Sequence, residues 1–254
     1  LCAILSAQAV RMLQARDETL SLSTVTRNRQ DWYPEYASTI SARAGCEISK
    51  ELESLGEGSV WTFTRNGCGR DSISRRLFVA GDSHATAYIA LLRDFAMETG
   101  IEVRLYQAPD CGFFDFRSSK KPARMRCRPL VDAAMADIAR RAQRGDVLFL
   151  PSLRLQRLSD EWVAFDRGEV EARNAGRAAI AARRQGLVLA RWRLLPLARR
   201  GVRIVFEAPT PLFPAPAYRC SDAFNRDNPV CAGGLEMPRA ELEAYRAPVL
   251  RTMQ

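Results

Sequence analysis

The sequence is poor in lysine and histidine. Of its 38 basic residues only Lys50, Lys120 and Lys121 are lysines, and His84 is the single histidine. The net charge is +9, but the arginines are scattered along the chain and often stand beside acidic residues. This pattern predicts a solvated, arginine-biased surface rather than a nucleic-acid-binding protein, which would concentrate its basic residues and interleave them with aromatic ones.

Long hydrophobic runs are also lacking. No stretch reaches the roughly 20 apolar residues that a membrane-spanning helix needs. The segment "LCAILSAQAV" is apolar over residues 1–10 and is followed by Arg11 and Arg16. We interpret it either as the end of a membrane helix or as a short amphipathic terminal helix. A hydrophobic content of 47% with 26% charged residues excludes a disordered chain and suffices for one well-packed domain.

Motifs for metals and nucleotides are missing as well. The sequence has no Cys-x-x-Cys or His-x-x-x-His spacing, which zinc sites use. It has no Gly-x-Gly-x-x-Gly loop of the kind that binds a dinucleotide. We therefore expect no metal, nucleotide or flavin, and no cofactor in this domain.

Six of the seven cysteines form local pairs, and each pair encloses polar sequence typical of a loop. The pairs are Cys46 with Cys68, Cys111 with Cys127, and Cys220 with Cys231. Such pairing predicts three disulfides and an oxidising compartment. The alternative is that all seven cysteines are reduced and buried. Cys2 is left over and lies in the apolar segment at the start.

From Leu77 onward, short apolar strands alternate with helices. The patterns predict strands at 77–81, 101–107, 145–151 and 201–209, and helices at 84–99, from Pro129, at 169–200 and at 238–254. We expect the long third helix to be interrupted near Gly186, and residues 17–74 to be irregular. The alternation predicts an α/β fold with a parallel sheet that helices cover on both faces.

Polar residues follow three of the expected strands. They are Asp82-Ser83-His84, Asp110-Cys111-Gly112, and the stretch from Ser152 to Arg154. Ligand sites of parallel sheets lie at the carboxyl ends of the strands. We therefore expect these three loops to converge.

Ser83 is the candidate nucleophile of this site. It stands where a strand passes directly into a helix, and backbone N–H groups at a helix start can stabilise a developing oxyanion. Gly81 permits the tight exit from the strand, and Asp82 can cap the helix. The plainer alternative is that Asp82 and Ser83 form a helix cap and nothing more. We reject His84 as the base of Ser83, because adjacent residues at a helix start rarely bring their reactive atoms together.

The segment "FVAGDSHATAY" resembles the first block of the SGNH hydrolases. It is most similar to the periplasmic SGNH domains fused to the membrane part of acyltransferase family 3 proteins. The resemblance extends to "GDVLFLPSLRLQRLSDEW", "GVRIVFEAPTPLF" and "YRCSDAFNRDNPVC", and so covers most of residues 68–254. It implies a flavodoxin-like, three-layer α/β/α fold whose C-terminal strand and triad block are missing from this chain.

The resemblance also implies a function and a domain organisation. Members join a membrane acyltransferase module, which handles the acyl donor, to an SGNH domain on the periplasmic side of the bacterial inner membrane. They transfer acyl groups, usually acetyl, to cell-surface carbohydrates such as lipopolysaccharide. Residues 1–16 would then be the end of a membrane helix or a linker, residues 17–74 a periplasmic extension, and residues 75–254 the SGNH domain.

By the same resemblance, Ser83 matches the nucleophile and its N–H is one oxyanion donor, with Asp82 and His84 in supporting positions. Gly112 matches the glycine of the second block. Many SGNH enzymes have an asparagine in the third block, where Ser152 or Arg154 stands here. The final block, Asp-x-x-His, does not occur in the sequence, and we expect the triad's orienter and base beyond Gln254.

Two other functions are compatible with these residues. One is a stand-alone periplasmic or secreted esterase of the same fold that removes acyl groups from carbohydrates. The other is a non-catalytic glycan-binding domain, which the missing base would explain.

Overall fold

The computed structural model describes residues 45–67, 73–108, 111–114, 121–160 and 162–253. Our expectations for residues 1–16, and for the extension up to residue 44, lie outside these residues. The chain forms two compact units. In described residues, the larger unit holds 45–155, 172–210 and 246–253, and the smaller holds 156–171 and 211–245.

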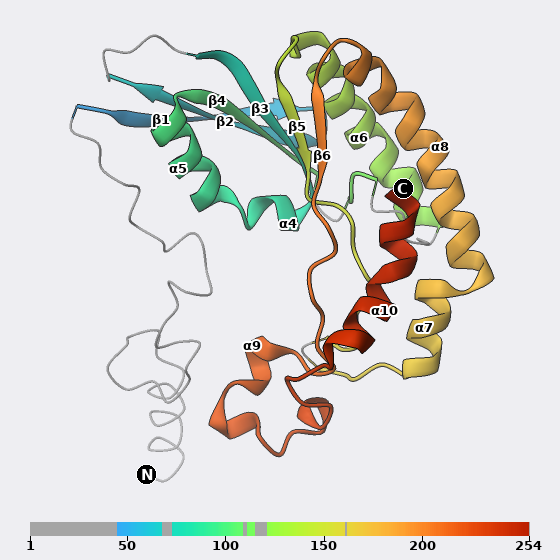
Figure 1. The fold of residues 1–254 in the computed structure, drawn as a ribbon. Coiled ribbons are helices and arrows are strands. Elements are labelled where there is room, and N and C mark those ends of the chain that lie inside the picture. The colour runs from blue at the N-terminus through green and yellow to red at the C-terminus, as the bar shows by residue number, and fades with distance from the viewer. Residues whose placement is uncertain (1–44, 68–72, 109–110, 115–120, 161, 254) are drawn as a thin grey trace. The chain divides into compact units, whose positions relative to one another are not determined.

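The larger unit contains a mixed, mostly parallel sheet of six strands, in the order β1-β2-β4-β3-β5-β6 (Figure 1). The strands are β1 (Glu47–Leu55), β2 (Gly58–Asn66), β3 (Ile73–Gly81), β4 (Ile101–Gln107), β5 (Val147–Leu150) and β6 (Arg203–Phe206). β3 pairs in parallel with β4 and β5, and β5 with β6. The predicted α/β fold is confirmed, and the order of these four strands is the flavodoxin-like one.

The helices alternate with the parallel strands as expected, but the helix predicted from Pro129 begins at Lys121, and Pro129 lies within it. They are α4 (Ser83–Thr86), α5 (Ile89–Thr99), α6 (Lys121–Arg141), α7 (Arg167–Ala175), α8 (Arg177–Arg199), α9 (Ala217–Cys220) and α10 (Arg239–Leu250), with 3-10 turns η2 (Ala223–Asn225), η3 (Pro229–Cys231) and η4 (Arg251–Met253). The expected break near Gly186 was wrong: the interruption falls at Gly176, which has extended backbone geometry before α8. A Cβ at Gly176 would lie 2.4 Å from the Ala172 carbonyl oxygen, so this break requires glycine.

The expectation of irregular structure over residues 17–74 was wrong for residues 47–66. β1 and β2 form an antiparallel hairpin around Gly56, whose φ of 61° favours glycine. β2 continues the sheet through antiparallel pairing with β4. β1 is mostly exposed and rich in charge, so it lacks the apolar alternation that marks a strand in the sequence. A charged edge strand of this kind resists pairing with other chains.

The two faces of the sheet have different coverings. Alternate residues of the central strands, such as Val79 and Leu105, pack with Leu92 and Ala96 beneath α4 and α5. The intervening residues point to the opposite face, where the Phe78 and Tyr106 rings lie 6.3 Å apart. α6 and α8 lie on that second side (Figure 1). This alternation completes the expected three layers.

Disulfides account for much of the cysteine pattern. The predicted bonds Cys111–Cys127 and Cys220–Cys231 are confirmed, with Cα–Cα distances of 5.3 Å and 5.5 Å. Cys46 is disulfide-bonded, and Cys68 lies outside the described residues. Each of the two confirmed bridges closes a short loop and thereby reduces the conformational freedom of the unfolded chain.

The smaller unit has little regular structure of its own. Its Cys220–Cys231 bridge links α9 to η3. The Tyr245 hydroxyl donates to the Gln156 carbonyl oxygen at 2.8 Å, which joins two segments distant in the sequence. The Arg219 guanidinium lies 4.5 Å from the centre of the Trp162 ring.

Candidate active site

The passage from β3 into α4 is closely packed. A Cβ at Gly81 would lie 2.8 Å from the Ala85 Cβ and 3.4 Å from Pro151, so a larger residue would displace the start of the helix. Asp82 caps α4: its Oδ1 accepts the His84 backbone N–H at 3.0 Å, and its carbonyl oxygen accepts the N–H of Ala85 at 3.0 Å. Because both groups of Asp82 are engaged, the backbone around Ser83 is fixed.

Ser83 is the first residue of α4 and is exposed to solvent, directly after the carboxyl end of β3. Its neighbours on both sides are less exposed: Asp82 is buried and His84 is half-buried. A serine hydroxyl in this position is open to a substrate, while the backbone that carries it is held in place. The structure therefore puts Ser83 where the sequence predicted it.

A buried ion pair connects the loops after β3 and β5. Arg154 Nη2 pairs with Asp82 Oδ1, and the two side chains are 14% and 5% exposed. The same Asp82 oxygen lies 4.0 Å from His84 Nδ1, and the imidazole is 37% exposed. The predicted convergence of these two loops is confirmed, and Arg154 is the residue that produces it.

Ser152 and Gly112 are placed differently from Arg154. Ser152 is buried, and its hydroxyl donates to the Leu150 carbonyl oxygen at 3.5 Å. Gly112 follows Cys111, whose N–H donates to the Ala108 carbonyl oxygen at 3.0 Å. Within the described part of the chain, neither Ser152 nor Gly112 forms a hydrogen bond with Ser83. Their roles as oxyanion donors therefore stay predictions, and Asp110 of the same loop lies outside the described residues.

Two polar contacts at this edge of the sheet were missed by the sequence analysis. At the end of β4, Gln107 Nε2 donates to Thr86 Oγ1 of α4 at 3.0 Å. Just after β6, the Glu207 carboxylate accepts a hydrogen bond from the Tyr88 hydroxyl. Both Gln107 and Glu207 are polar residues at strand ends, so the rule that identified Asp82 and Arg154 also identifies them.

Tyr88 is held in its protonated form by this environment. Burial, then the hydrogen bond to Glu207 and the negative charge of that carboxylate, raise the pKa of Tyr88 from about 10 to about 12. Its ring also packs edge-on against Phe149 of β5, with centroids 5.6 Å apart. At neutral pH Tyr88 is therefore a hydrogen-bond donor that joins α5 to the end of β6, and it cannot serve as a base.

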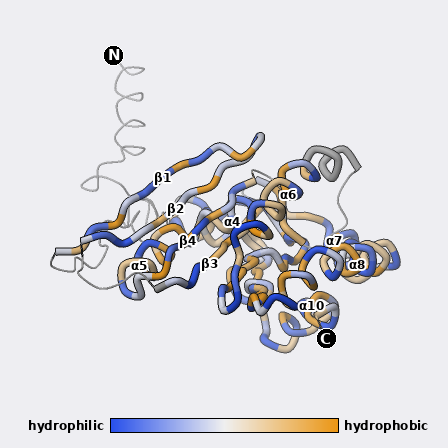
Figure 2. Tube along the Cα trace, turned by 90° about the horizontal axis from the view of Figure 1, so that it is seen from above, coloured by the Kyte–Doolittle hydropathy of each residue, from blue (hydrophilic) through white to orange (hydrophobic). Residues whose placement is uncertain are grey.

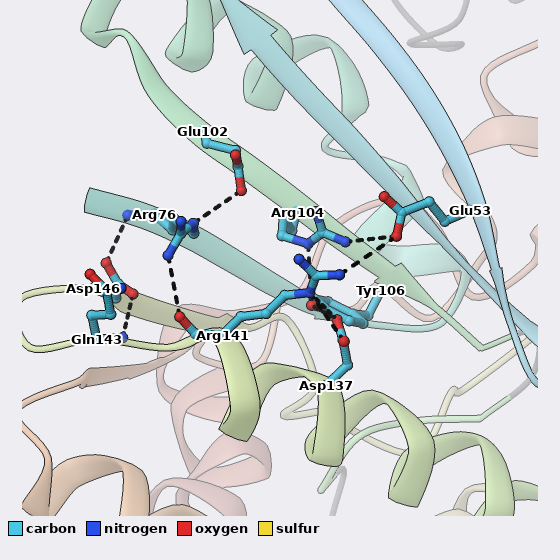
Figure 3. A network of polar contacts seen from close by, with 9 residues as sticks. All are labelled: Glu53, Arg76, Glu102, Arg104, Tyr106, Asp137, Arg141, Gln143 and Asp146. Carbon is cyan, nitrogen blue, oxygen red and sulfur yellow. Dashed lines mark hydrogen bonds and ion pairs between the residues drawn. The ribbon is translucent and has the colours of Figure 1, made fainter. Parts of the chain in front are cut away.

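A second polar cluster lies on the other face of the sheet, beneath α6 (Figure 3). The Tyr106 hydroxyl donates to Asp137 Oδ2 at 2.7 Å, and Arg141 Nε donates to the same carboxylate. Arg104, which is buried, donates to Glu53 at 3.1 Å and to the Tyr106 oxygen at 3.4 Å. Each charge in this cluster has a partner of the opposite sign.

The charges of this second cluster are stabilised in their ordinary states. Burial would raise the pKa of Asp137, but the hydrogen bonds from Tyr106 and Arg141, with the charges of Arg141 and Arg140, hold it below its usual value. Burial and the Asp137 carboxylate raise the pKa of Tyr106. The cluster thus joins α6 to the sheet and contains no exposed nucleophile.

Within the described ranges, no group of three or more His, Cys, Asp or Glu side chains is arranged to hold a metal ion. No helix among those residues is both long enough and apolar enough to cross a bilayer.

Two solved structures are similar to this chain at low sequence identity. Among solved structures, a bacterial heroin esterase aligns with 80% of this chain and 56% of its own, at 14% identity and a TM-score of 0.33. A putative lipase from Acinetobacter baumannii AYE aligns with 82% of this chain and 62% of its own, at 10% identity and a TM-score of 0.27. The chain spans less than two thirds of the length of either protein.

No curated protein matches the sequence significantly. The family described as "SGNH domain (fused to AT3 domains)" matches residues 45–254, which includes the hairpin, the Ser83 loop and all later elements. The chain therefore belongs to the family of SGNH domains that are fused to AT3 domains.

Proposed function

We propose that this SGNH domain transfers an acyl group, in the simplest case acetyl, to a hydroxyl group of a cell-envelope carbohydrate, with Ser83 as the nucleophile. One observation above all supports this assignment. Ser83 is exposed at the start of α4, and the residue before it is a buried aspartate that Arg154 holds from a different strand end. An accessible hydroxyl on a fixed backbone is what acyl transfer through a serine requires.

The reaction takes place in two steps. Ser83 Oγ attacks the carbonyl carbon of the acyl donor, and a base removes the hydroxyl proton while N–H groups stabilise the oxyanion. The bond to the donor breaks, and the proton passes to the departing group. A carbohydrate hydroxyl then attacks the acyl-serine ester, loses its proton to the same base, and regenerates free Ser83.

We assign supporting roles to the groups around Ser83. Asp82 fixes the first turn of α4 through the His84 N–H, and Arg154 holds the Asp82 carboxylate. The His84 Nδ1 is directed at Asp82, so we propose that His84 takes part in this support and is not the base for Ser83. The sequence has no second imidazole, so we expect these 254 residues alone to hydrolyse a simple acetyl ester only slowly.

We also propose the cellular setting. The AT3 domains to which this family is fused indicate a membrane-associated protein, whose membrane module would handle the acyl donor. The Cys111–Cys127 and Cys220–Cys231 bridges fit an oxidising compartment, and so support a location on the periplasmic side of the inner membrane. The acceptor would then be a surface glycan such as lipopolysaccharide.

The test is the Ser83→Ala substitution in the protein together with its membrane module. We expect acyl transfer to fall about 10³-fold or more, because removal of a nucleophile leaves only binding and oxyanion stabilisation. The measurement is the ester content of the envelope glycan, determined by mass spectrometry. The matched control is Ser54→Ala, which removes an exposed hydroxyl from β1 and should leave transfer unchanged.

Both variants should unfold at the temperature of the parent protein, because surface substitutions usually change stability by less than about 0.5 kcal/mol. Undiminished transfer by folded Ser83→Ala protein would disprove the nucleophile assignment.

A further inference from the structure

Helix α8 has an unusual charge composition. Its 23 residues include six arginines and neither aspartate nor glutamate. One side of the helix is buried through Ala179, Ala190, Leu194 and Leu197, which is the ordinary inward face of a helix packed on a sheet.

The outward side of α8 is apolar at its centre. Val188 is 70% exposed, Trp192 is 72% exposed and Leu195 is 46% exposed. Their spacing of four and three residues places them in one stripe, opposite the buried residues. Figure 2 shows hydrophobic and hydrophilic segments interspersed along α8, and in Figure 1 no other described element of this unit covers its outer side. We call these three residues the α8 stripe.

Arginines surround the α8 stripe. Arg184, Arg191 and Arg199 are exposed and lie on the same half of the helix. In the described residues, none of the three forms an ion pair. The surface therefore combines exposed aliphatic and indole groups with positive charges that pair with no acidic group among the described residues.

A pocket adjoins this surface. It has a volume of about 400 Å³ and lies between α8 and the segment that ends in η4. Arg183, Arg184 and Arg251 line it, together with apolar groups that include Ile180 and Leu187. Arg184 lines the pocket and also borders the α8 stripe.

None of the described residues that line this pocket gives Arg183 a counter-charge. It is only 7% exposed, and its Nη1 donates to the Asn174 carbonyl oxygen at 2.6 Å, which is neutral. Burial, and then the nearby charge of Arg251, lower the pKa of Arg183. A bound anion would offset both effects, because a buried charge is stable when it is paired.

We propose that the outward face of α8 docks on the surface of an anionic phospholipid bilayer, with the α8 stripe at the headgroup boundary and a lipid phosphate in the Arg183–Arg184–Arg251 pocket. Tryptophan and aliphatic side chains bordered by arginine are the combination that binds such surfaces. The proposal concerns a different part of the domain from Ser83 and does not depend on its chemistry.

Two other occupants fit the charges less well. A second copy of the chain would place one acid-free helix carrying six arginines against another, and the like charges would repel. A nucleic acid would neutralise the arginines but would leave Val188 and Leu195 without apolar contacts. The AT3 domains of the family place a bilayer within reach of this domain.

The test measures binding of the 254-residue chain to vesicles. We expect co-sedimentation with vesicles of phosphatidylcholine and phosphatidylglycerol in equal amounts, and much weaker binding to phosphatidylcholine alone. Added salt should weaken the binding, because the arginine contribution is screened. Trp192 fluorescence, taken as the difference from a Trp192→Phe variant, should be quenched by brominated lipid.

Substitutions test the contributions of the arginines and of the α8 stripe separately. Arg184→Gln and Arg251→Gln should each reduce affinity about fivefold. The double variant Val188→Gln/Trp192→Gln should lower co-sedimentation with the mixed vesicles at least about fivefold, because it removes apolar groups from the α8 stripe. The matched controls are Arg239→Gln and Trp162→Gln, which alter exposed residues outside α8 and should bind as the parent does.

Three results would overturn the proposal. They are equal binding to both vesicle types, unchanged binding by the α8 variants, and a concentration-dependent dimer that the Val188→Gln/Trp192→Gln variant disrupts. Ser83→Ala should bind vesicles like the parent, so failure of this proposal and failure of the proposed function are distinguishable.

Discussion

Two buried aspartates of this domain are paired with arginine, yet their surroundings differ. Asp82 lies at the carboxyl edge of the parallel strands, paired with Arg154 and beside the exposed Ser83. Asp137 lies beneath α6 on one face of the sheet, and its carboxylate is bound by Tyr106, Arg140 and Arg141. Burial of a charged pair therefore does not by itself indicate function. The candidate site is distinguished by the reactive group that its ion pair leaves exposed.

The largest expected change in stability comes from the cluster that lacks a nucleophile. Asp137→Ala should reduce the free energy of unfolding by about 3–5 kcal/mol, because it removes the partner of buried polar groups. Chemical denaturation monitored by circular dichroism measures this change. The control, Glu243→Ala, breaks an exposed pair with Arg239 and should cost at most about 1 kcal/mol.

The pH dependence provides a second measure of the same residue. The pKa of Asp137 is lowered in the folded state, so its stabilising contribution is present above its usual pKa and is lost as the pH falls. The difference in stability between the parent and Asp137→Ala should therefore shrink below about pH 4. A difference that is independent of pH would show that the carboxylate charge is not what stabilises α6.

At the other aspartate we expect the effect mainly on activity. Arg154→Gln releases the Asp82 carboxylate that caps α4 and should reduce acyl transfer about 10- to 100-fold through misplacement of Ser83. Arg154→Lys keeps the charge and should restore part of the activity. Transfer assays below the unfolding temperature of each variant separate this effect from a loss of stability.

The contrast between the two aspartates would fail if Arg154→Gln mainly lowered stability and Asp137→Ala mainly lowered acyl transfer. An Arg154→Gln variant with full activity would show that the Asp82 pair is only structural. The double variant Asp82→Asn/Arg154→Gln removes both charges. It should be more stable than Arg154→Gln alone, but its acyl transfer should stay as low.

The smallest expected effect concerns Tyr88. Its pKa is raised to about 12 in the folded state, so its contribution to stability is complete below about pH 10 and is lost as the pH rises towards 12. The ultraviolet absorbance of tyrosinate should show one fewer high-pH transition in Tyr88→Phe than in the parent. Ionisation of Tyr88 near pH 10 would indicate that its contact with Glu207 is not maintained in solution.

Much of the fold followed from the sequence because its central strands are short apolar runs. "LFVAG" and "GDVLFLP" are inner strands of the parallel part of the sheet, and their order with the helices predicted the architecture. "GVRIVFEAP" was expected to be buried as well, but its strand β6 is last in the strand order and half-exposed. The hairpin β1–β2 was missed because β1 is a charged, exposed edge strand. The break at Gly176 was missed because it depends on the close approach of the Ala172 carbonyl oxygen, which only the folded chain shows.

The candidate site was predictable in part. Asp82, Ser83 and Arg154 follow from the rule that sites lie at the carboxyl ends of parallel strands. The partnership of Arg154 with Asp82 did not follow, because 72 residues separate them and only the folded sheet brings them together. Arg104 and Tyr106 belong to an ordinary alternating strand, so nothing local indicated that both would be buried in a polar cluster.

The central claim is that Ser83 is the nucleophile of acyl transfer, and the most direct test is covalent trapping. The protein with its membrane module would be treated with a fluorophosphonate, which reacts with activated serines, and its peptides analysed by mass spectrometry. We predict a single added phosphonyl group on Ser83, with acyl transfer lost in proportion to labelling and no labelling in Ser83→Ala. Full transfer activity with Ser83 labelled, or inhibition with the label on another residue, would contradict the account.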